Sequence, residues 1–188
     1  MTVYVATHNA HKLREIGELL PGFEIRSEDP DAEETAPDFA GNALIKARAI
    51  AAAHAGCWVM ADDSGLEVAA LGGEPGVRSA RYAGGHGDTA KNNALLLENL
   101  AGVADRGARF VCSIALVSPE GKEFSVQGVC EGRIVESAAG VQGFGYDPLF
   151  VPRGFDRTFA ELSAEEKNAL SHRGRALAAA REVLEAGA

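Results

Sequence analysis

The chain has 188 residues, of which 46% are hydrophobic and 24% are charged, values that are ordinary for one globular domain with its own core. Lys and Arg number 18 against 27 Asp and Glu, and the net charge of -9 argues against a module that binds nucleic acid through a basic surface. A small anionic ligand is compatible with this charge, because local lysines and amides can overcome the global field.

The cysteines and the apolar runs indicate the compartment. Cys57, Cys112 and Cys130 are odd in number, widely spaced and without a CxxC pair, so we expect neither a disulfide framework nor a zinc site. We expect all three to be buried in a reducing compartment. No apolar run approaches the ~18 residues of a membrane span, and residues 1–6 are too short for a secretion signal. The sequence therefore predicts a cytoplasmic protein with no membrane partner.

The first third of the chain alternates short apolar runs with helical patterns. Asn9 is placed to cap a helix that has Leu13, Ile16 and Leu20 on one face. An acidic stretch with prolines then precedes an alanine-rich helical segment. In chain order we expect a strand at 3–6, a helix from Asn9 to Leu20, a loop with a short extended piece at 24–38, a helix at 39–55 and a buried strand at 58–61.

The rest of the chain adds a hairpin between helices. Phe110, Cys112 and Ile114 alternate as in a half-buried strand, and Ser163 with Glu166 fits a capping box. We expect a loop at 71–76, a helix at 89–100, strands at 109–118 and 122–131 joined by a turn at 119–121, a glycine-rich loop at 141–148 and a C-terminal helix through Leu184. Strands interleaved with helices indicate an α/β fold with a mixed sheet.

The segment from Thr7 to Lys12 joins the first strand to the first helix. A helix N-terminus presents free amides and the positive end of a dipole, which favour phosphate. Lys12 lies in the first turn, where side chains tilt back toward the N-terminus, so its ammonium can reach an anion bound there. The alternative is an ordinary connection in which Asn9 is only a structural cap, since the segment has no Walker glycine run.

Asp62 and Asp63 directly follow the strand predicted at 58–61. The end of a strand is where α/β sheets place their ligands. Two adjacent carboxylates are costly unless a cation neutralises them, and hard oxygen ligands suit Mg²⁺ that is shared with substrate phosphates. The alternative is a solvated Asp-Ser-Gly turn.

Glu33 and Glu34 lie in the acidic loop before the second helix. By themselves they indicate a solvated charge run, and they gain meaning only as a second carboxylate source for the same metal. Lys46 follows Asn42 by four residues, so the two share a helix face. For Lys46 the alternative is a lysine that points to water.

Two blocks in the last third could hold a base. The loop Gly143–Pro148 has flexible backbone beside aromatic rings, which can admit a flat ring while Asp147 accepts hydrogen bonds from base nitrogens. Lys167 and Arg173 would point to different sides of one straight helix, so a shared ligand needs a helix break near Ser171. The alternatives are a hydrophobic loop anchor and an uninterrupted amphipathic helix.

Taken together, these blocks resemble the inosine triphosphate pyrophosphatase family, also called the HAM1-like or RdgB-like dITP/XTP pyrophosphatases. The resemblance covers essentially the whole chain, in the family's order. The matching blocks are Thr7-x-Asn9-x-x-Lys12, Ala32–Thr35, Phe39-x-x-Asn42-Ala43-x-x-Lys46-Ala47, Ala61–Leu66, Pro75-Gly76, Ser79–Tyr82, Gly143–Pro148 and Ser171–Gly174. His8 stands where a small residue or Asn is more usual, and Ala36 where Gly is common; neither departure removes a proposed catalytic group.

The resemblance implies that ITP, dITP and XTP are hydrolysed at the α-phosphorus to the monophosphate and pyrophosphate. It implies Asp63, Lys46 and Lys12 as catalytic residues, with Glu34 and Asp63 binding Mg²⁺ and Asp63 as the base. The implied substrate-binding residues are Thr7, His8, Asn9, Ala10, His11, Lys12, Ser64, Phe144, Gly145, Tyr146, Asp147, Lys167, His172 and Arg173. The implied fold over 1–188 is one elongated, two-lobed domain with a long curved mixed sheet, flanking helices and a ligand cleft between the lobes, usually as a homodimer.

Residue chemistry agrees with this assignment. Mg²⁺ with Lys12 and Lys46 would neutralise the charge that builds on the α-phosphate and on the leaving pyrophosphate. Donors that face a 6-keto oxygen would be left unpaired by adenine, which selects against ATP. Two alternatives stay open. One is a phosphatase that uses Asp62 or Asp63 as a nucleophile and releases orthophosphate, and the other is a nucleotide sensor that binds without turnover.

Overall fold

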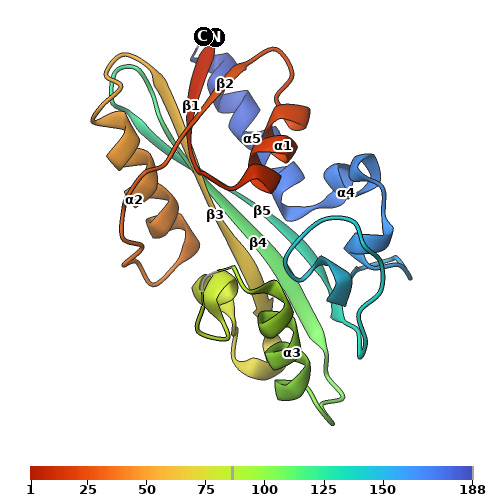
Figure 1. The fold of residues 1–188 in the computed structure, drawn as a ribbon. Coiled ribbons are helices and arrows are strands. Elements are labelled where there is room, and N and C mark those ends of the chain that lie inside the picture. The colour runs from red at the N-terminus through yellow and green to blue at the C-terminus, as the bar shows by residue number, and fades with distance from the viewer. Residues whose placement is uncertain (86, 188) are drawn as a thin grey trace. The chain divides into compact units, whose positions relative to one another are not determined.

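The computed structural model describes residues 1–85 and 87–187. The strands in this part of the chain are β1 (Thr2–Ala6), β2 (Glu24–Glu28), β3 (Trp58–Val68), β4 (Gly107–Val117), β5 (Glu123–Ile134) and β6 (Phe150–Pro152). They form one sheet in the order β2-β1-β3-β4-β5-β6 (Figure 1). β1 is parallel to β2 and β3, whereas β6 is antiparallel to β5. The predicted α/β class with a mixed sheet is therefore confirmed.

Helices flank this sheet. The α-helices of the described residues are α1 (Ala10–Leu19), α2 (Phe39–Ala51), α3 (Thr89–Asn99), α4 (Ala164–Leu170) and α5 (His172–Ala186). The short 3₁₀ helices are η1 (Ala69–Leu71), η2 (Gly76–Arg81), η3 (Asp147–Leu149) and η4 (Phe159–Glu161). Within these residues, no helix combines the length and the apolar character that crossing a membrane requires.

Two predictions about helix ends are confirmed, and the structure decides between the two alternatives left open at Ser171. Asn9 Oδ1 accepts hydrogen bonds from the backbone N–H groups of His11 (3.0 Å) and Lys12 (3.2 Å) at the start of α1. Ser163 and Glu166 form the expected capping box at the start of α4. Ser171 has φ -69° and ψ 159°, so the backbone is extended there and α4 is separated from α5. The starts of α1 and α4 depend on side chains within three residues of them, which is why the sequence alone predicts them.

The chain folds into two compact units, each with a core of its own. Unit 1 comprises Met1–Asp63, Cys112–Gly128 and His172–Ala188, and unit 2 comprises Ser64–Val111 and Val129–Ser171. The strands β3, β4 and β5 contribute residues to both units. The expected description of 1–188 as a single two-lobed domain stays a prediction.

In unit 1, strand residues alternate between two hydrophobic clusters. Trp58 and Met60 of β3 belong to a cluster with side chains of α1 and α5, whereas Val59 and Ala61 belong to a cluster with side chains of α2. Successive strand residues point to opposite faces of a sheet, so α2 covers one face and α1 with α5 covers the other (Figure 1). The same alternation sends the next two residues of β3, the two aspartates, to opposite faces.

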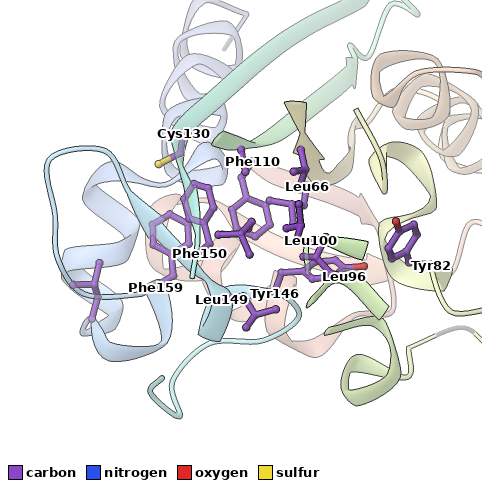
Figure 2. Close-up of a cluster of buried hydrophobic side chains, with 14 residues drawn as sticks. Leu66, Tyr82, Leu96, Leu100, Phe110, Cys130, Tyr146, Leu149, Phe150 and Phe159 are labelled. Atoms are coloured by element: carbon purple, nitrogen blue, oxygen red, sulfur yellow. The ribbon is translucent and has the colours of Figure 1, made fainter. Parts of the chain in front are cut away.

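Unit 2 has an aromatic core (Figure 2). The ring centroid of Phe110 lies 4.7 Å from that of Phe150 and 5.7 Å from that of Phe159. Gly132 of β5 lets this core close, because a Cβ there would lie 2.3 Å from the carbonyl oxygen of Val151 and 2.5 Å from the ring of Phe150. Buried aromatic pairs of this kind contribute about 0.5–1.5 kcal/mol beyond their buried area.

The structure corrects four expectations from the sequence. β3 extends to Val68 and does not end at residue 61. α2 ends at Ala51, four residues earlier than predicted. The strand that contains Phe110 is not half-buried, since residues 110–117 are all buried between clusters on both faces. Cys57 is only partly buried, whereas Cys112 and Cys130 are buried; the described cysteines form no disulfide, as predicted.

Cys112 is expected to resist alkylation in the folded protein. Burial, assisted by the charge of Asp62, raises the pKa of its thiol to about 12. At pH 8, iodoacetamide should modify Cys57 while Cys112 and Cys130 stay unmodified, and in urea all three should react. Peptide mass spectrometry measures this directly. Rapid native labelling of Cys112 would show that the core of unit 1 is open.

Candidate functional site

Asp62 and Asp63 are at the centre of the candidate site in unit 1. They lie inside β3, just beyond the paired stretch in which Val5 of β1 is opposite Met60. Asp62 is 2% exposed and Asp63 is 8% exposed, so neither is a residue of a solvated turn. Because they point to opposite faces of the sheet, each carboxylate meets a different set of cations.

Asp62 is held by two cations on the face covered by α1 and α5. Its Oδ2 lies 3.0 Å from Lys12 Nζ and 3.2 Å from Arg173 Nη2. Arg173 Nη1 in turn pairs with Glu15 Oε2. Burial opposes ionisation of Asp62, but the charges of Lys12 and Arg173 outweigh it and hold its pKa well below the ordinary range. Asp62 is therefore a fixed, buried anion, which counts against its serving as an exposed nucleophile.

The loop that carries Lys12 is ordered by its own side chains. Thr7 Oγ1 accepts a hydrogen bond of 3.1 Å from the backbone N–H of Asn9. The backbone N–H groups of His11 and Lys12 donate to Asn9 Oδ1. The sequence predicted free amides for a phosphate here, and for these two amides that prediction is wrong. The dipole of α1 and the ammonium of Lys12 still favour an anion at this helix start. His8 is exposed, with Nδ1 3.4 Å from Oδ2 of Asp29.

Asp63 lies beside a lysine and a second carboxylate on the face covered by α2. Lys46 Nζ is 2.9 Å from Glu34 Oε1 and 3.6 Å from Asp63 Oδ1. Burial raises the pKa of Asp63. The charge of Lys46 opposes this rise, and the neighbouring carboxylates add to it. Burial works against the charge of Lys46, yet Asp63 and the other carboxylates raise its pKa. The result is a protonated lysine beside a carboxylate that is more basic than a free Asp.

Asn42 anchors the loop that carries Glu34. Its side chain is fully buried, and its Oδ1 accepts a hydrogen bond of 2.9 Å from the backbone N–H of Ala36. The loop also packs tightly on the start of α2, where a Cβ on Gly41 would lie 2.5 Å from the Cβ of Ala36. The loop is thus attached to α2 by backbone packing, by Asn42 and by the ion pair of Lys46 with Glu34.

The two carboxylates predicted to bind Mg²⁺ converge on one cation. Glu34 and Asp63 both lie within ion-pair distance of the ammonium of Lys46. Among residues 1–85 and 87–187, the neighbouring Asp62 also has one buried carboxylate oxygen, Oδ1, with no hydrogen-bond partner. Those residues hold no group of three or more His, Cys, Asp or Glu side chains that could bind a metal. A cation held by two carboxylates must complete its coordination with water or substrate oxygens, which is the usual arrangement for Mg²⁺. The donor set therefore fits magnesium.

Unit 2 carries the aromatic loop, which we define as Gly143–Asp147. Asp147 Oδ2 accepts hydrogen bonds from the backbone N–H of Phe144 (2.9 Å) and from Lys167 Nζ (2.7 Å). Lys167 Nζ also lies 4.9 Å from the centroid of the Phe144 ring. Gly143 has φ +73°, and a Cβ there would lie 2.1 Å from Asp147 Oδ2. The loop therefore gathers a half-buried ring, a lysine and a carboxylate around one point.

Not every predicted site residue lies where the sequence suggested. Ser64 is half-buried on β3, and His172, 4% exposed, is the first residue of α5. Tyr146 is 5% exposed, and its hydroxyl donates to the carbonyl oxygen of Ser79 (2.7 Å) and does not lie open to a ligand. Arg173 is 2% exposed and belongs to unit 1, where Asp62 and Glu15 are its partners. Its expected contact with the base stays a prediction.

Two residues with clear structural roles at the site were missed by sequence reasoning. Glu15 lies three residues after Lys12 on α1, a spacing that places both on one helix face. Asn42 lies four residues before Lys46 on α2, a spacing that places both on one helix face but predicts no role for the amide. The spacing on each helix is visible in the sequence, but the partners are not. Arg173 is far from Glu15 in the chain, and Ala36 lies in a loop whose backbone path the sequence does not predict.

Comparison with known proteins points to one family. The sequence pattern of the Ham1 family matches residues 3–183. The dITP/XTP pyrophosphatase of Mycobacteroides abscessus is 51% identical, covering 95% of this chain and 92% of the relative, and that of Leifsonia xyli subsp. xyli is 50% identical, covering 98% and 96%. The solved structure of the Staphylococcus aureus Ham1 protein is similar with a TM-score of 0.89 and 38% identity, covering 99% of each chain.

Proposed function

Because this chain belongs to the Ham1 family, we propose that it is an enzyme that hydrolyses ITP, dITP and XTP to the nucleoside monophosphate and pyrophosphate. The observation that carries the proposal is the position of Asp63, a carboxylate beside Lys46 and Glu34 in buried surroundings that raise its pKa. A carboxylate at this position can lie within hydrogen-bond reach of a water molecule that attacks phosphorus and accept its proton.

The phosphate chemistry is assigned to residues of unit 1. Mg²⁺ bound by Glu34 and Asp63 would supply Lewis-acid polarisation of the phosphate oxygens. Lys46 lies 3.6 Å from Asp63 Oδ1, so its ammonium is placed to stabilise charge that develops on the α-phosphate. Lys12 would neutralise charge on the phosphates that leave. Its position is set by Asp62, because that carboxylate is itself held by Arg173.

The reaction adds one water to the α-phosphorus and breaks the bond from that phosphorus to the bridging oxygen. Asp63 takes a proton from the attacking water, and the bridging oxygen departs with the β-phosphate as pyrophosphate. Asp62 keeps a negative charge throughout because its pKa is held low, so it holds Lys12 and does not compete as a base. The division of roles between two adjacent aspartates follows from the different cations on the two faces of β3.

Base recognition is assigned to the aromatic loop and α4 in unit 2. Phe144 would stack on the purine, and Lys167 would donate to the 6-keto oxygen of hypoxanthine or xanthine. Asp147 holds Lys167 and would accept hydrogen bonds from ring nitrogens that carry a proton. Adenine has an amino group in place of the 6-keto oxygen, so it would leave the lysine donor unpaired. From the resemblance we also retain Ser64, His172 and Arg173 as substrate-binding residues.

A product assay tests this function. Purified protein is incubated with Mg²⁺ and with ITP, dITP, XTP, GTP or ATP, and pyrophosphate and orthophosphate are quantified separately. Pyrophosphate from ITP, dITP and XTP, with little from ATP, is the expected result, and the yield from GTP measures any further selection against guanine. Orthophosphate as the first product would favour an aspartyl-phosphate phosphatase, and tight binding without turnover would favour a nucleotide sensor.

Three further properties belong to this proposal. We expect Mg²⁺ as the cofactor, a homodimer as the assembly and the cytoplasm as the location. The net charge of -9 supports a small nucleotide over nucleic acid as the partner. Size-exclusion chromatography with light scattering measures the assembly, and removal of Mg²⁺ with EDTA should abolish pyrophosphate release until the metal is restored.

A further inference from the structure

The segment from Pro75 to Tyr82 matches the family's pattern but has no part in the chemistry above. It forms η2 in unit 2, and Ser79 at its centre is 7% exposed. Ser79 Oγ donates to the carbonyl oxygen of Gly76 (2.6 Å) and accepts from the backbone N–H of Leu66 (2.9 Å). Leu66 is the third residue after Asp63 on β3, so Ser79 attaches η2 to the strand that carries the catalytic aspartate.

The same residue holds the aromatic loop. The hydroxyl of Tyr146 donates to the carbonyl oxygen of Ser79 at 2.7 Å, in a buried environment. The preceding loop residue is held from α3, since Asn93 Nδ2 donates to the carbonyl oxygen of Gly145 at 3.2 Å. Two consecutive residues of the loop, the last two before Asp147, are thus attached to the body of unit 2.

A second asparagine of α3 completes this network. Asn92 is 4% exposed, and its Nδ2 donates to the carbonyl oxygens of Ser79 (3.4 Å) and Ala80 (3.2 Å). Its Oδ1 accepts from the backbone N–H of Ala83 at 2.8 Å. Two adjacent residues of α3 therefore hold η2 and the aromatic loop, Asn92 the former and Asn93 the latter. The carbonyl oxygen of Ser79 accepts one hydrogen bond from α3 and one from the aromatic loop.

We propose that Tyr146 and Asn93 are positioning residues that set base selectivity by holding the aromatic loop against Ser79 and α3. This inference rests on the proposed function, because it concerns the selection of a 6-keto purine nucleotide. Tyr146 acts here through its hydroxyl on Ser79 and not as a group that reads the base. The role assigned to η2 is that of a fixed support for the loop.

Geometry explains why such support matters. Asp147 Oδ2 accepts from the N–H of Phe144 and from Lys167 Nζ at once, at 2.9 Å and 2.7 Å. Space beside this oxygen is so limited that a Cβ on Gly143 would come within 2.1 Å of it. A small shift of Gly145 or Tyr146 would therefore move the carboxylate and, with it, the ammonium that it holds. A displaced lysine would lose its hydrogen bond to the 6-keto oxygen, which weakens the binding of a 6-keto purine more than that of adenine.

Replacing Tyr146 by Phe tests the inference, with Tyr82→Phe as a matched control. Both tyrosines are buried in the aromatic core of unit 2 (Figure 2). The hydroxyl of Tyr82 bonds to Glu74 (3.1 Å) and Asn99 (2.8 Å), which are not part of the aromatic loop or of its contacts with Ser79. In Tyr146→Phe, Asn92 still donates to the carbonyl of Ser79, so no buried acceptor loses all its partners.

For Tyr146→Phe we expect KM for ITP to rise about 3- to 10-fold, as suits the loss of one buried hydrogen bond. We expect kcat to change less than about 2-fold. The ratio of kcat/KM for ITP to kcat/KM for ATP should fall as the KM for ITP rises. Tyr82→Phe should keep the KM and the ratio of the wild type. A merely structural role would lower the thermal midpoints of both variants without changing the ratio, and that result would overturn the inference.

Asn93→Ala is an independent second probe of the same support. Its Oδ1 is already buried with no hydrogen-bond partner in the part of the chain that the structure describes, so truncation removes an unsatisfied atom along with the donor to Gly145. It should show the same rise in KM and fall in selectivity. If the wild type releases pyrophosphate selectively from ITP but both Tyr146→Phe and Asn93→Ala match it, the inference fails alone. If the wild type itself does not select ITP over ATP, the proposed function has failed.

Discussion

Asp63→Asn is expected to lower kcat for ITP by about 10²–10⁴-fold while nucleotide binding survives, because an amide of the same shape cannot take the proton of the attacking water. Asp63 is 8% exposed and lies 3.6 Å from Lys46 Nζ, so the variant changes one proton acceptor inside a buried group of charges. Pyrophosphate release measures kcat, and isothermal titration with ITP measures the Kd. A loss of binding together with turnover would instead assign Asp63 mainly to holding the nucleotide.

A matched control separates this effect from a general change of charge. Asp156 is exposed in a loop of unit 2, and Asp156→Asn removes the same charge from a residue with no proposed role in the chemistry. We expect this variant to keep the wild-type kcat within about 2-fold, as surface changes usually do. Equal activity of Asp63→Asn and Asp156→Asn would rule out Asp63 as the base.

Arg173→Leu is expected to lower the free energy of unfolding by about 3–5 kcal/mol, because it leaves two buried carboxylates without their shared cation. Asp62 is 2% exposed and Glu15 is 7% exposed, and Arg173 bonds to both. Urea unfolding followed by circular dichroism measures the difference. Arg181→Leu is the control, since Arg181 pairs with Glu185 on the exposed face of α5 and should contribute less than about 1 kcal/mol.

The pH dependence of this difference checks its cause. Despite burial, Lys12 and Arg173 lower the pKa of Asp62 in the folded protein below its ordinary value of 3.8. A depressed pKa contributes stability that is present above the unfolded value and is lost as pH falls toward the folded value. The gap between wild type and Arg173→Leu should therefore be constant near pH 7 and begin to shrink below about pH 4. A gap that grows on acidification would show that the charge of Asp62 is not involved.

The sequence alone determined those features that depend on near neighbours in the chain. Asn9 caps α1, and the box of Ser163 and Glu166 starts α4, because each capping side chain bonds to an amide two or three residues away. A break near Ser171 was required only if Lys167 and Arg173 were to share a ligand, and an uninterrupted helix was the alternative; the backbone is extended at Ser171, so α4 and α5 are separate helices. The α/β class followed from the alternation of apolar runs, which reports local burial directly.

The length of β3 could not be predicted, because two adjacent aspartates are typical of a turn. What keeps Asp62 inside a buried strand is the charge of Lys12 and Arg173, and Arg173 is 111 residues away in the chain. What keeps Asp63 there is Lys46 on the opposite face. A carboxylate can be buried at low cost only when a cation pairs with it. The residues next to Asp62 and Asp63 in the sequence do not indicate which cation that is.

Tertiary structure alone also decided which groups are engaged before any ligand binds. The resemblance implies that His172 and Arg173 read the base, which stays a prediction, and only the folded structure shows that the guanidinium of Arg173 bonds to Asp62 and Glu15. The hydroxyl of Tyr146 is likewise committed to Ser79, 67 residues earlier in the chain. Residue type and spacing determine what a side chain can bond to. Which bond it makes depends on the partner that folding places within hydrogen-bonding distance and in a suitable direction.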